Sequence, residues 1–275
     1  MTTFAEETQV RAGPNGLRAQ ASPSWGAWGP NGGCLSATAL RAAGAAVPLG
    51  HRPSSLTVQY LAAAAFGEID CAVQPLREGR SAWCVNVMLR QAGRPILQAQ
   101  VWTTNRTGGP ECCADRPEDV PPPEGLRGWT ELLGAPSPLA MWRNFDARPL
   151  TFVRPDARHP EGPVTREWYR WNEFPANPDV FLDAGRMVVL VDCLAFASHA
   201  SGLDFAPDYV APNLDLAVWF HDSPAGSPWL FADARSGIAK DSLIHGETKV
   251  WSEDGRLLAS GATHLLHVAR PPGAA

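Results

Sequence analysis

The same order of predicted secondary structure occurs twice along the chain. A helix-compatible run rich in Ala and Leu, residues 34–46, precedes four strand-like runs, and a second helical run, from about residue 178 to 200, precedes four more. The glycine at the last turn of the first set, Gly93, recurs as Gly255, an offset of 162 residues. Self-similarity at this spacing predicts two copies of one α+β module packed together, each with a sheet wrapped around its long helix.

The strand-like runs carry the alternation of apolar and polar residues that is typical of β-strands. The first helix is followed by "SLTVQYL", "EIDCAVQPL", "SAWCVNVMLRQ" and "QAGRPILQAQVWT", and the second by "NLDLAVWFH", "WLFADARSGIA", "SLIHGETKVWS" and "RLLASGATHLLHVA". Gly93-Arg94 predicts a hairpin turn between the last two strands of the first set. Two alternating aromatic segments, "LAMWRNFDARPLTF" and "TREWYRWNE", predict further strands ahead of the second helix.

Residues 106–137 separate the two modules and differ from them in composition. Their first part, "RTGGPECCADRPEDVPPPEGLRG", is rich in Pro, Gly and charged residues and has no apolar period. The sequence therefore predicts an N-terminal module over residues 1–105, a linker or surface loop over 106–137, and a C-terminal module over 138–275.

The charge and hydropathy of the chain argue against several classes of protein. The formal net charge is −5 and the 23 basic residues are scattered, so no basic stripe follows a phosphate backbone and nucleic acid is not expected as a partner. The N-terminus, "MTTFAEETQV", lacks the basic region and apolar stretch of a signal peptide, and no apolar run reaches the roughly 20 residues of a membrane span. A cytoplasmic protein without a membrane span is therefore expected.

Neither the cysteines nor the histidines form a metal-binding pattern. The six cysteines are irregularly spaced and include no C-x-x-C pair, and the seven histidines include no H-x-x-x-H pair. We expect free thiols, with Cys112 and Cys113 in an exposed loop, and no metal site.

One ionisable residue lies in the apolar core of the second helix. The run "VVLVDCLAF", residues 188–196, has Asp192 at its centre. An ionised carboxylate on an apolar helix face costs several kcal/mol unless donors or a cation meet it. Two explanations remain open. Asp192 is a general base whose pKa is raised by desolvation until it can take a proton from water, or it faces outward or accepts structural hydrogen bonds.

Taken in order, these pieces resemble the double-hotdog acyl-CoA thioesterases of the acyl-CoA thioesterase II type. The matching pieces are "GPNGG", "SLTVQYL", "LREGRSAWCVNVMLRQAGRPILQAQVW", "LVDCLAF", "NLDLAVWFH" and "DGRLLASGATH", and they cover roughly residues 28–104 and 139–268. The resemblance implies an α+β double-hotdog fold and hydrolysis of acyl-CoA or a related acyl thioester. It also implies no cofactor apart from the CoA of the substrate, and assembly into a homo-oligomer.

The resemblance further implies roles for three residues. In the family, a carboxylate on the second helix acts with a Thr or Ser and a Gln on neighbouring strands to position the attacking water. The carboxylate falls on Asp192, the hydroxyl position on Asn213 and the Gln position on Thr263, so this sequence departs from the family at two of the three. An amide at position 213 can still hold a water, with a polar residue at a strand start as the alternative, whereas Thr263 reaches less far than Gln and has one donor.

A second group of residues is predicted to bind substrate. In "WGPNGG", Asn31, Gly32 and Gly33 precede the first helix, where glycines let a substrate approach the backbone and helix N–H groups can polarise a thioester carbonyl. Simple turn chemistry explains the same residues equally well. Thr57 in "SLTVQYL" and Asp215, expected on the same strand face as Asn213, complete this group.

The tryptophans and two other functions are left open by the sequence. Trp142, Trp168, Trp171, Trp219 and Trp229 lie in strand-like runs, where core packing is expected and a tunnel wall that favours short or ring-containing acyl groups is the alternative. The carrier is either CoA or an acyl-carrier protein. An acyl-thioester-binding or tailoring protein without hydrolysis, and a hotdog hydratase or dehydratase, are the alternative functions.

Overall fold

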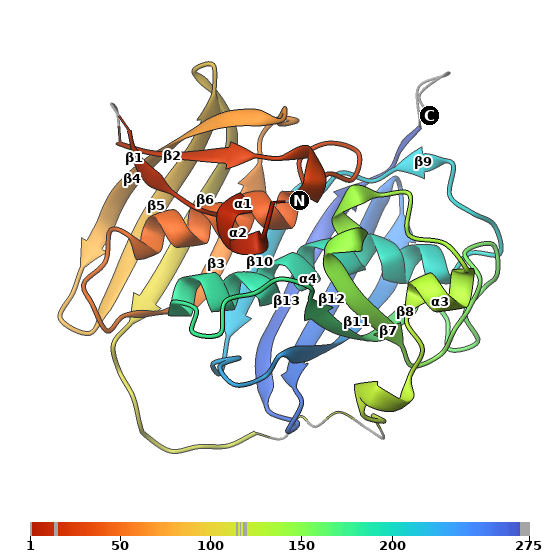
Figure 1. The fold of residues 1–275 in the computed structure, drawn as a ribbon. Coiled ribbons are helices and arrows are strands. Elements are labelled where there is room, and N and C mark those ends of the chain that lie inside the picture. Colours follow the sequence, from red (N-terminus) through yellow and green to blue (C-terminus); the bar gives the residue numbers. More distant parts are fainter. Residues whose placement is uncertain (1, 14–15, 114, 116, 118–119, 270–275) are drawn as a thin grey trace.

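One antiparallel sheet curves around two central helices (Figure 1). The computed structural model describes residues 2–13, 16–113, 115, 117 and 120–269, so parts of the predicted modules (residue 1, residues 14–15 and residues 270–275) lie outside the described residues. Within the described part, the strand order in the large sheet is β1-β2-β4-β5-β6-β3-β10-β13-β12-β11-β8-β7. The order runs outward in the same way on both sides of the β3–β10 pair, as the predicted repeat requires.

The strands of the first half of the sheet are β1 Arg11–Gly13, β2 Gly16–Ala21, β3 Arg52–Tyr60, β4 Gly67–Glu78, β5 Ala82–Gln91 and β6 Arg94–Thr104. Those of the second half are β7 Phe145–Pro149, β8 Val164–Trp171, β10 Asp215–Phe220, β11 Trp229–Lys240, β12 Leu243–Ser252 and β13 Leu257–Leu266. A separate two-stranded sheet pairs β9 Tyr209–Val210 with β14 Val268–Ala269. The shorter elements are α1 Phe4–Glu7, α3 Trp129–Leu133, and the 3-10 turns η1 Pro23–Trp25, η2 Pro123–Gly125 and η3 Ala140–Asn144.

The two long helices are confirmed, as α2 Gly32–Gly44 and α4 Val180–Ser201. Each begins at a side-chain cap, since the Asn31 side chain accepts from the Cys34 N–H and the Asp179 side chain accepts from two N–H groups of the first turn of α4. The helices pack against each other through small residues: a Cβ at Gly185 would already lie 3.2 Å from the Cβ of Ala37. The Ala-rich composition of α2 is explained by this close contact.

The two halves share one sheet and one core. Strands β3 and β10 pair antiparallel, with Leu56 opposite Val218 and Val58 opposite Leu216, and all four side chains are buried. The main hydrophobic cluster continues across this pair from one half into the other. Each half therefore completes the other, because a sheet edge left open at β3 or β10 would expose unpaired backbone groups and apolar side chains.

Three predicted boundaries need correction. The first hairpin turn consists of Ala92 and Gly93, one position before the predicted pair, because both have positive φ, as a two-residue hairpin turn of type I′ requires. The segment 139–152 is the 3-10 turn η3 and a short strand β7 instead of one strand. Strands β1 and β2 precede α2 in the Gly/Pro-rich start, so strands precede the helix in both halves.

The segment predicted as a linker is in part a wall of the molecule. Val120 and Leu126 pack on an aromatic cluster on one face of β8, β11 and β12, formed by Trp168, Trp229, Phe231 and Trp251. Residues 128–139, which include α3, line the large cavity described below. The Pro-rich composition of this segment suits an irregular path across the surface, and only the tertiary structure shows what it covers.

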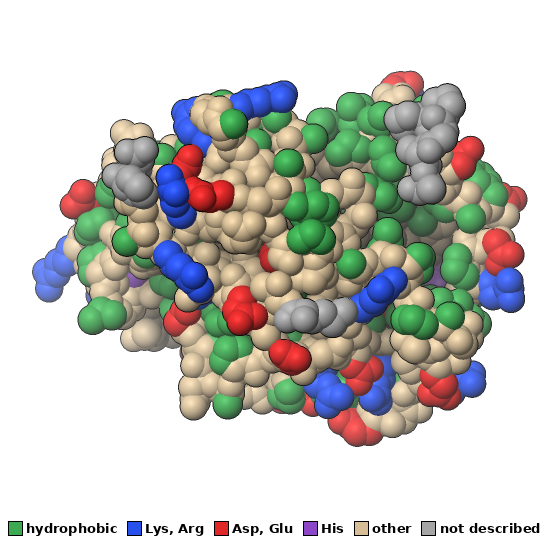
Figure 2. All heavy atoms as spheres, turned by 45° about the horizontal axis from the view of Figure 1, so that its top comes forward, with side chains coloured by type: hydrophobic (Ala, Val, Ile, Leu, Met, Phe, Trp, Pro, Cys, Tyr) green, Lys and Arg blue, Asp and Glu red, His purple; other side chains and the backbone are tan. Residues whose placement is uncertain are grey.

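The charged side chains, the helices and the cysteines can be compared with the composition. On the face drawn in Figure 2, Lys and Arg side chains lie scattered among Asp and Glu side chains. No helix in the described residues has both the length and the apolar character needed to cross a membrane. All six cysteines are free, and Cys112 and Cys113 are exposed as predicted.

Candidate active site

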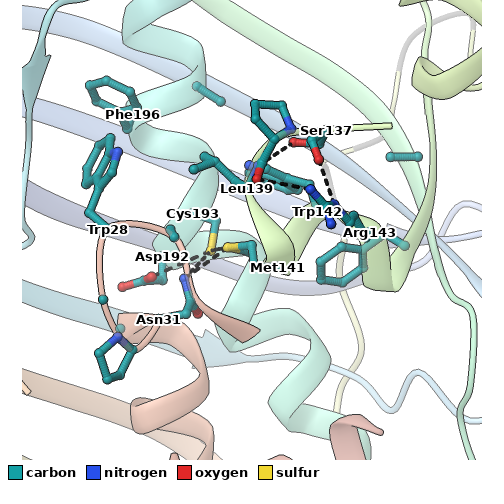
Figure 3. Close-up of a pocket in the computed structure, with 18 of the residues that line it drawn as sticks. Trp28, Asn31, Ser137, Leu139, Met141, Trp142, Arg143, Asp192, Cys193 and Phe196 are labelled. Atoms are coloured by element: carbon teal, nitrogen blue, oxygen red, sulfur yellow. Dashed lines mark hydrogen bonds between the residues drawn. The ribbon is translucent and has the colours of Figure 1, made fainter. Parts of the chain in front are cut away.

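A cavity of about 1230 Å³ lies between the two halves of the molecule. The start of α2 and the end of β3 line it from the N-terminal half, and α4, β8 and the segment before β10 line it from the C-terminal half, with residues 128–139 along one side. Figure 3 shows Asp192 and Asn31 next to each other, with Trp28 and Phe196 on one side of them and Met141 and Trp142 on the other. The rings of Trp28 and Phe196 meet edge to face, 5.0 Å apart.

Asp192 is buried in the wall of this cavity, and its carboxylate accepts two short hydrogen bonds besides a longer one from the Cys193 thiol. Oδ1 accepts from the Tyr60 hydroxyl at 2.7 Å, and Oδ2 accepts from the Gly33 N–H at 2.8 Å. The side chain is 4% exposed. Burial excludes the possibility that Asp192 faces outward. The bonds from Tyr60 and Gly33 are consistent with a structural carboxylate and with an oriented general base.

The environment of Asp192 raises the pKa of its carboxyl group above the ordinary value. Burial raises the pKa of the carboxyl to about 6, although the hydrogen bonds from Tyr60, Gly33 and Cys193 act in the opposite direction. The hydroxyls of Tyr60 and Ser36 lie 2.9 Å apart, so Ser36 can in turn donate to Tyr60. A carboxylate with this pKa is ionised near neutral pH and is basic enough to accept a proton from a reacting group.

Asn31 links the start of α2 to the opposite wall of the cavity. Its side-chain oxygen caps α2 by accepting from Cys34 N–H at 2.9 Å, which directs the amide nitrogen toward the sulfur atoms of Met141 and Cys193, both 3.2 Å away. Sulfur is a weak acceptor. The amide nitrogen of Asn31 is therefore a fixed donor at the cavity with only weak partners.

The turn η3 positions Met141 by contacts with the N-terminal half. The Met141 N–H donates to the Gly26 carbonyl at 3.0 Å, and the Asn144 side-chain amide donates to the Ser24 carbonyl at 2.9 Å. These bonds tie a segment of the C-terminal half to the loop that precedes α2. The cavity wall beside Asn31 is consequently assembled from both halves.

The two positions at which the sequence departs from the pattern that the resemblance implies are bonded to each other. Asn213 lines the cavity, and its amide nitrogen donates to the Thr263 hydroxyl at 2.9 Å and to the Asp192 backbone carbonyl at 3.4 Å. The Thr263 hydroxyl donates its only proton to the Asp215 carbonyl at 2.6 Å, so toward Asn213 it can only accept. Thr263 is buried, 1% exposed. Because it can only accept, the amide nitrogen of Asn213 points toward it and the amide oxygen points away.

The glycines at the start of α2 have different partners. The Gly33 N–H is occupied by Asp192, and the Cys34 N–H by Asn31, so neither is free for a substrate. Gly32 lines the cavity, and within the described residues no acceptor lies against its N–H. A Cβ at position 32 would lie 2.9 Å from Asp192 Oδ1, so only glycine leaves the carboxylate accessible here.

Two predicted substrate-binding residues lie outside the cavity. Thr57 is exposed on the outer face of β3, because the alternation that buries Leu56 and Val58 directs it away from the helices. Asp215 is half exposed and accepts from the His264 N–H at 2.9 Å. The period-2 relation between Asn213 and Asp215 fails because regular pairing in β10 begins only at Asp215.

The tryptophans separate into different environments. Trp142 lines the cavity, Trp171 packs in the main core, and Trp168 and Trp229 belong to the aromatic cluster on the other face of the sheet. Trp219 is 50% exposed. The tunnel-wall interpretation therefore applies to Trp142 among these five, joined by Trp28 and Trp129, which also line the cavity.

Sequence reasoning missed several residues of the site. Tyr60, the donor to Asp192, is the last residue of β3, two positions beyond the buried Val58, so strand alternation could have placed it on the inner face. Glu167 of β8 also lines the cavity, 7% exposed. Its partners come from α3 and β8, and the alternation of "TREWYRWNE" could have placed it on the same face as Tyr169.

Among the described residues, no group of three His, Cys, Asp or Glu side chains could hold a metal ion.

Two helices that are each wrapped by half of a continuous antiparallel sheet, with a cavity between the halves, define a double-hotdog protein. Solved structures share this fold. A "conserved protein of unknown function with hot dog fold" from Alicyclobacillus acidocaldarius has a TM-score of 0.84 and 22% identity, covering 98% of both chains. The acyl-CoA thioesterase II TesB2 from Mycobacterium marinum has a TM-score of 0.76 and 20% identity, covering 99% of this chain and 100% of that chain.

A dehydratase domain is a more distant neighbour. That of PpsC from Mycobacterium tuberculosis, solved in complex with C12:1-CoA, has a TM-score of 0.53 and 13% identity over 97% of this chain and 100% of that chain.

Family models cover most of the chain. The acyl-CoA thioesterase N-terminal domain matches residues 21–104, and the acyl-CoA thioesterase C-terminal domain matches residues 114–266. The chain belongs to the acyl-CoA thioesterase family, which confirms the resemblance noted in the sequence. No curated protein sequence matches the chain.

Proposed function

We propose that the chain hydrolyses acyl-CoA or a related acyl thioester to the free acid and the thiol, with water activated by Asp192. The observation that carries this proposal is a buried carboxylate, oriented by Tyr60 and Gly33, in a cavity formed between two hotdog modules. Burial raises its pKa to about 6, which suits a general base at neutral pH. Membership of the acyl-CoA thioesterase family supports the choice of substrate.

In this proposal Asn213 holds the attacking water together with Asp192. Both hydrogen atoms of the Asn213 amide have acceptors, in Thr263 and the Asp192 carbonyl, so its side-chain oxygen is the end left for the cavity. That oxygen accepts one proton of the water while Asp192 accepts the other. Thr263 acts as a positioning residue, since it holds the amide in this orientation without touching the cavity.

The thioester carbonyl is polarised at the start of α2. The Gly32 N–H and the positive end of the helix dipole face the cavity beside Asp192, and the Asn31 amide can exchange its weak sulfur acceptors for a carbonyl oxygen. Donors of this kind typically lower the barrier of acyl transfer by about 3 kcal/mol each. Gly33 does not take part directly, because its N–H is bonded to Asp192.

The chemical step follows from these positions. The water oxygen forms a bond to the thioester carbon while Asp192 takes a water proton, and the negative charge develops on the carbonyl oxygen near Gly32. The carbon–sulfur bond then breaks, and Asp192 returns the proton to the leaving sulfur. The products are a carboxylic acid and the free thiol, and Asp192 is ready for another cycle.

Thiol release from a panel of acyl-CoAs tests this proposal. The panel runs from acetyl to palmitoyl and includes phenylacetyl and benzoyl esters, with the wild type beside Asp192→Asn. Turnover that falls by roughly a hundredfold or more in the variant is the expected result for the loss of a general base. The matched control is Asp204→Asn, since Asp204 is exposed and outside the cavity and should leave turnover unchanged.

Other outcomes select the alternative functions. Binding of acyl-CoA without turnover of any panel member would replace hydrolysis with an acyl-thioester-binding or tailoring role. Hydration of an enoyl-CoA, detected by loss of its double bond, would assign the chain to the hydratase class.

A further inference from the structure

Glu167 is a buried carboxylate in the cavity that the proposed hydrolysis does not use. It lies on the inner face of β8, is 7% exposed and lines the same cavity as Asp192. A buried ionisable group of this kind is retained only where donors meet it or a ligand does. The question is which of its two oxygen atoms the protein satisfies.

Both donors from the protein reach the same oxygen of Glu167. Trp129 Nε1 donates to Oε2 at 2.9 Å, and the Tyr169 hydroxyl donates to Oε2 at 2.7 Å. Across the described residues, no hydrogen bond ends on Oε1, and Oε1 is not among the fully buried polar atoms without a partner, so this oxygen is accessible. The carboxylate is therefore oriented by one oxygen, while the other faces the cavity as an acceptor without a protein partner.

The walls around Glu167 are aromatic. The Tyr169 ring lies 6.3 Å from the Trp142 ring and 6.0 Å from the Phe145 ring, and the Trp129 side chain packs edge to face on Phe152 at 5.6 Å. Tyr169, Trp142, Phe145 and Trp129 all line the cavity. This part of the cavity places the accessible oxygen of Glu167 among flat apolar surfaces, which suits a ring that carries a donor.

This region extends away from Asp192 on the side of Met141. Met141 contacts Asn31 beside the catalytic carboxylate, and the next residue, Trp142, contacts Tyr169, which bonds Glu167. The polyanionic nucleotide of CoA is disfavoured beside a buried carboxylate, because like charges repel strongly where water is excluded. The acyl group, not the carrier, is accordingly the part of a thioester that fits here.

We propose that Glu167 is a specificity residue that accepts a hydrogen bond from a hydroxyl group on the acyl ring, so that the preferred substrates are thioesters of hydroxyaryl acids. This inference rests on the proposed thioester hydrolysis and names its substrate class. Burial raises the pKa of the Glu167 carboxyl, whereas the bonds from Trp129 and Tyr169 lower it. An aryl acyl group without the hydroxyl would leave the Glu167 oxygen unpaired and desolvated, which is the basis of the discrimination.

The experiment compares esters that differ only in the hydroxyl group. The kcat/KM values are measured for phenylacetyl-CoA against 4-hydroxyphenylacetyl-CoA, and for 3-phenylpropanoyl-CoA against 3-(4-hydroxyphenyl)propanoyl-CoA, so that two ring depths are sampled. Affinities are measured in parallel by calorimetry, with a non-hydrolysable thioether analogue of each ester. In at least one pair the hydroxylated member is expected to be favoured by at least about tenfold in both measurements.

Glu167→Gln tests the residue itself while preserving its shape. Trp129 and Tyr169 are expected to hold the Gln carbonyl in place of Oε2, which turns an N–H donor toward the cavity where an acceptor was. The preference for the hydroxyl should then fall below about threefold. Glu173→Gln, at an exposed carboxylate just beyond β8, should retain the wild-type preference.

The outcomes distinguish this inference from the proposed function. Equal kcat/KM values and equal affinities within both pairs would overturn the role of Glu167, even if hydrolysis is efficient. An equal loss for both members of each pair in Glu167→Gln would also overturn it, because the residue would then contact the carrier arm. Selective binding of the hydroxylated analogues without turnover would support the acyl-ring site and reject hydrolysis.

Discussion

The two halves of the sheet differ in the longer of the two strands that precede the helix of each half, β2 and β8. In β2 the inward side chains include Ala19 and Ala21, which are buried in the main core. In β8 the inward side chains include Glu167 and Tyr169, bonded to each other beside the cavity. The repeat places β2 and β8 at equivalent positions in the sheet. However, β2 covers a filled core, whereas β8 forms a wall of the cavity.

The two long helices show a related difference. α2 contributes backbone groups and its cap, in Asn31, Gly32 and Gly33, whereas α4 contributes the carboxylate of Asp192. Neither helix carries a complete site. The candidate site therefore exists only where the two diverged modules meet. Three substitutions test the helix contact, the bond from Tyr60 and the support of Asn213.

The largest effect is expected where the two helices touch. A Cβ at Gly33 would lie 2.8 Å from the Val189 Cα and 3.1 Å from the Asp192 Cβ, so Gly33→Ala forces the helices apart. Overpacking of this kind lowers the free energy of unfolding by about 1–3 kcal/mol. Urea unfolding measures the loss. Gly125→Ala, at a position with nothing within 4 Å, is the control and should unfold like the wild type. An equally stable Gly33→Ala would show that the contact between the halves is loose.

A smaller effect is expected from the Tyr60 hydroxyl, one of the two groups of the N-terminal half that donate to the Asp192 carboxylate. Thiol release should rise as pH increases through about 6 and level off above it, because only ionised Asp192 accepts a proton. The Tyr60 hydroxyl lowers the pKa of Asp192, so Tyr60→Phe should move the midpoint upward by about one to two pH units, the worth of a hydrogen bond to a charged group.

The pH dependence of kcat/KM measures this midpoint. Tyr209→Phe, which removes a hydroxyl bonded to His199 away from the cavity, should leave it in place. A midpoint that stays constant or falls in Tyr60→Phe would mean that the Tyr60 hydroxyl does not stabilise the ionised carboxylate.

The smallest effect is expected at Thr263, which acts only through Asn213. Thr263→Val removes the acceptor that orients the Asn213 amide, and kcat should fall by about three- to tenfold, the worth of one neutral hydrogen bond. Thr263→Ser keeps the hydroxyl and should restore most of the rate. Equal rates for Thr263→Val and the wild type would remove Asn213 from the set of water-binding residues.

Much of the fold was predictable because its determinants are local. Periodicity of apolar residues indicated α2, α4 and the strands after them, and the recurrence of Gly93 as Gly255 indicated the duplication. Strands β1 and β2 were missed, since β1 spans only Arg11–Gly13 and β2 follows a Gly/Pro-rich stretch where turns are the usual expectation.

The candidate site was predictable only in part. The apolar surroundings of Asp192 indicated a special carboxylate, and "GPNGG" indicated a glycine-lined approach to it. Thr57 and Asp215 were wrongly placed at the cavity. The alternation that buries Leu56 and Val58 directs Thr57 outward, and regular pairing in β10 begins only at Asp215. The wall formed by residues 128–139 has no apolar period, so no local pattern could reveal that it encloses a cavity.

The sequence by itself determined that this chain is a duplicated helix-and-sheet protein with a carboxylate inside its second helix, because periodicity and repetition are properties of neighbouring residues. The tertiary structure alone decided the partners of that carboxylate: Tyr60 is 132 residues away and Gly33 is 159 residues away. It likewise decided that Trp129 and Tyr169 bond the same oxygen of Glu167 and leave the other for the cavity. Hydrogen bonds between distant segments depend on how the two halves pack, and a linear pattern carries no record of that packing.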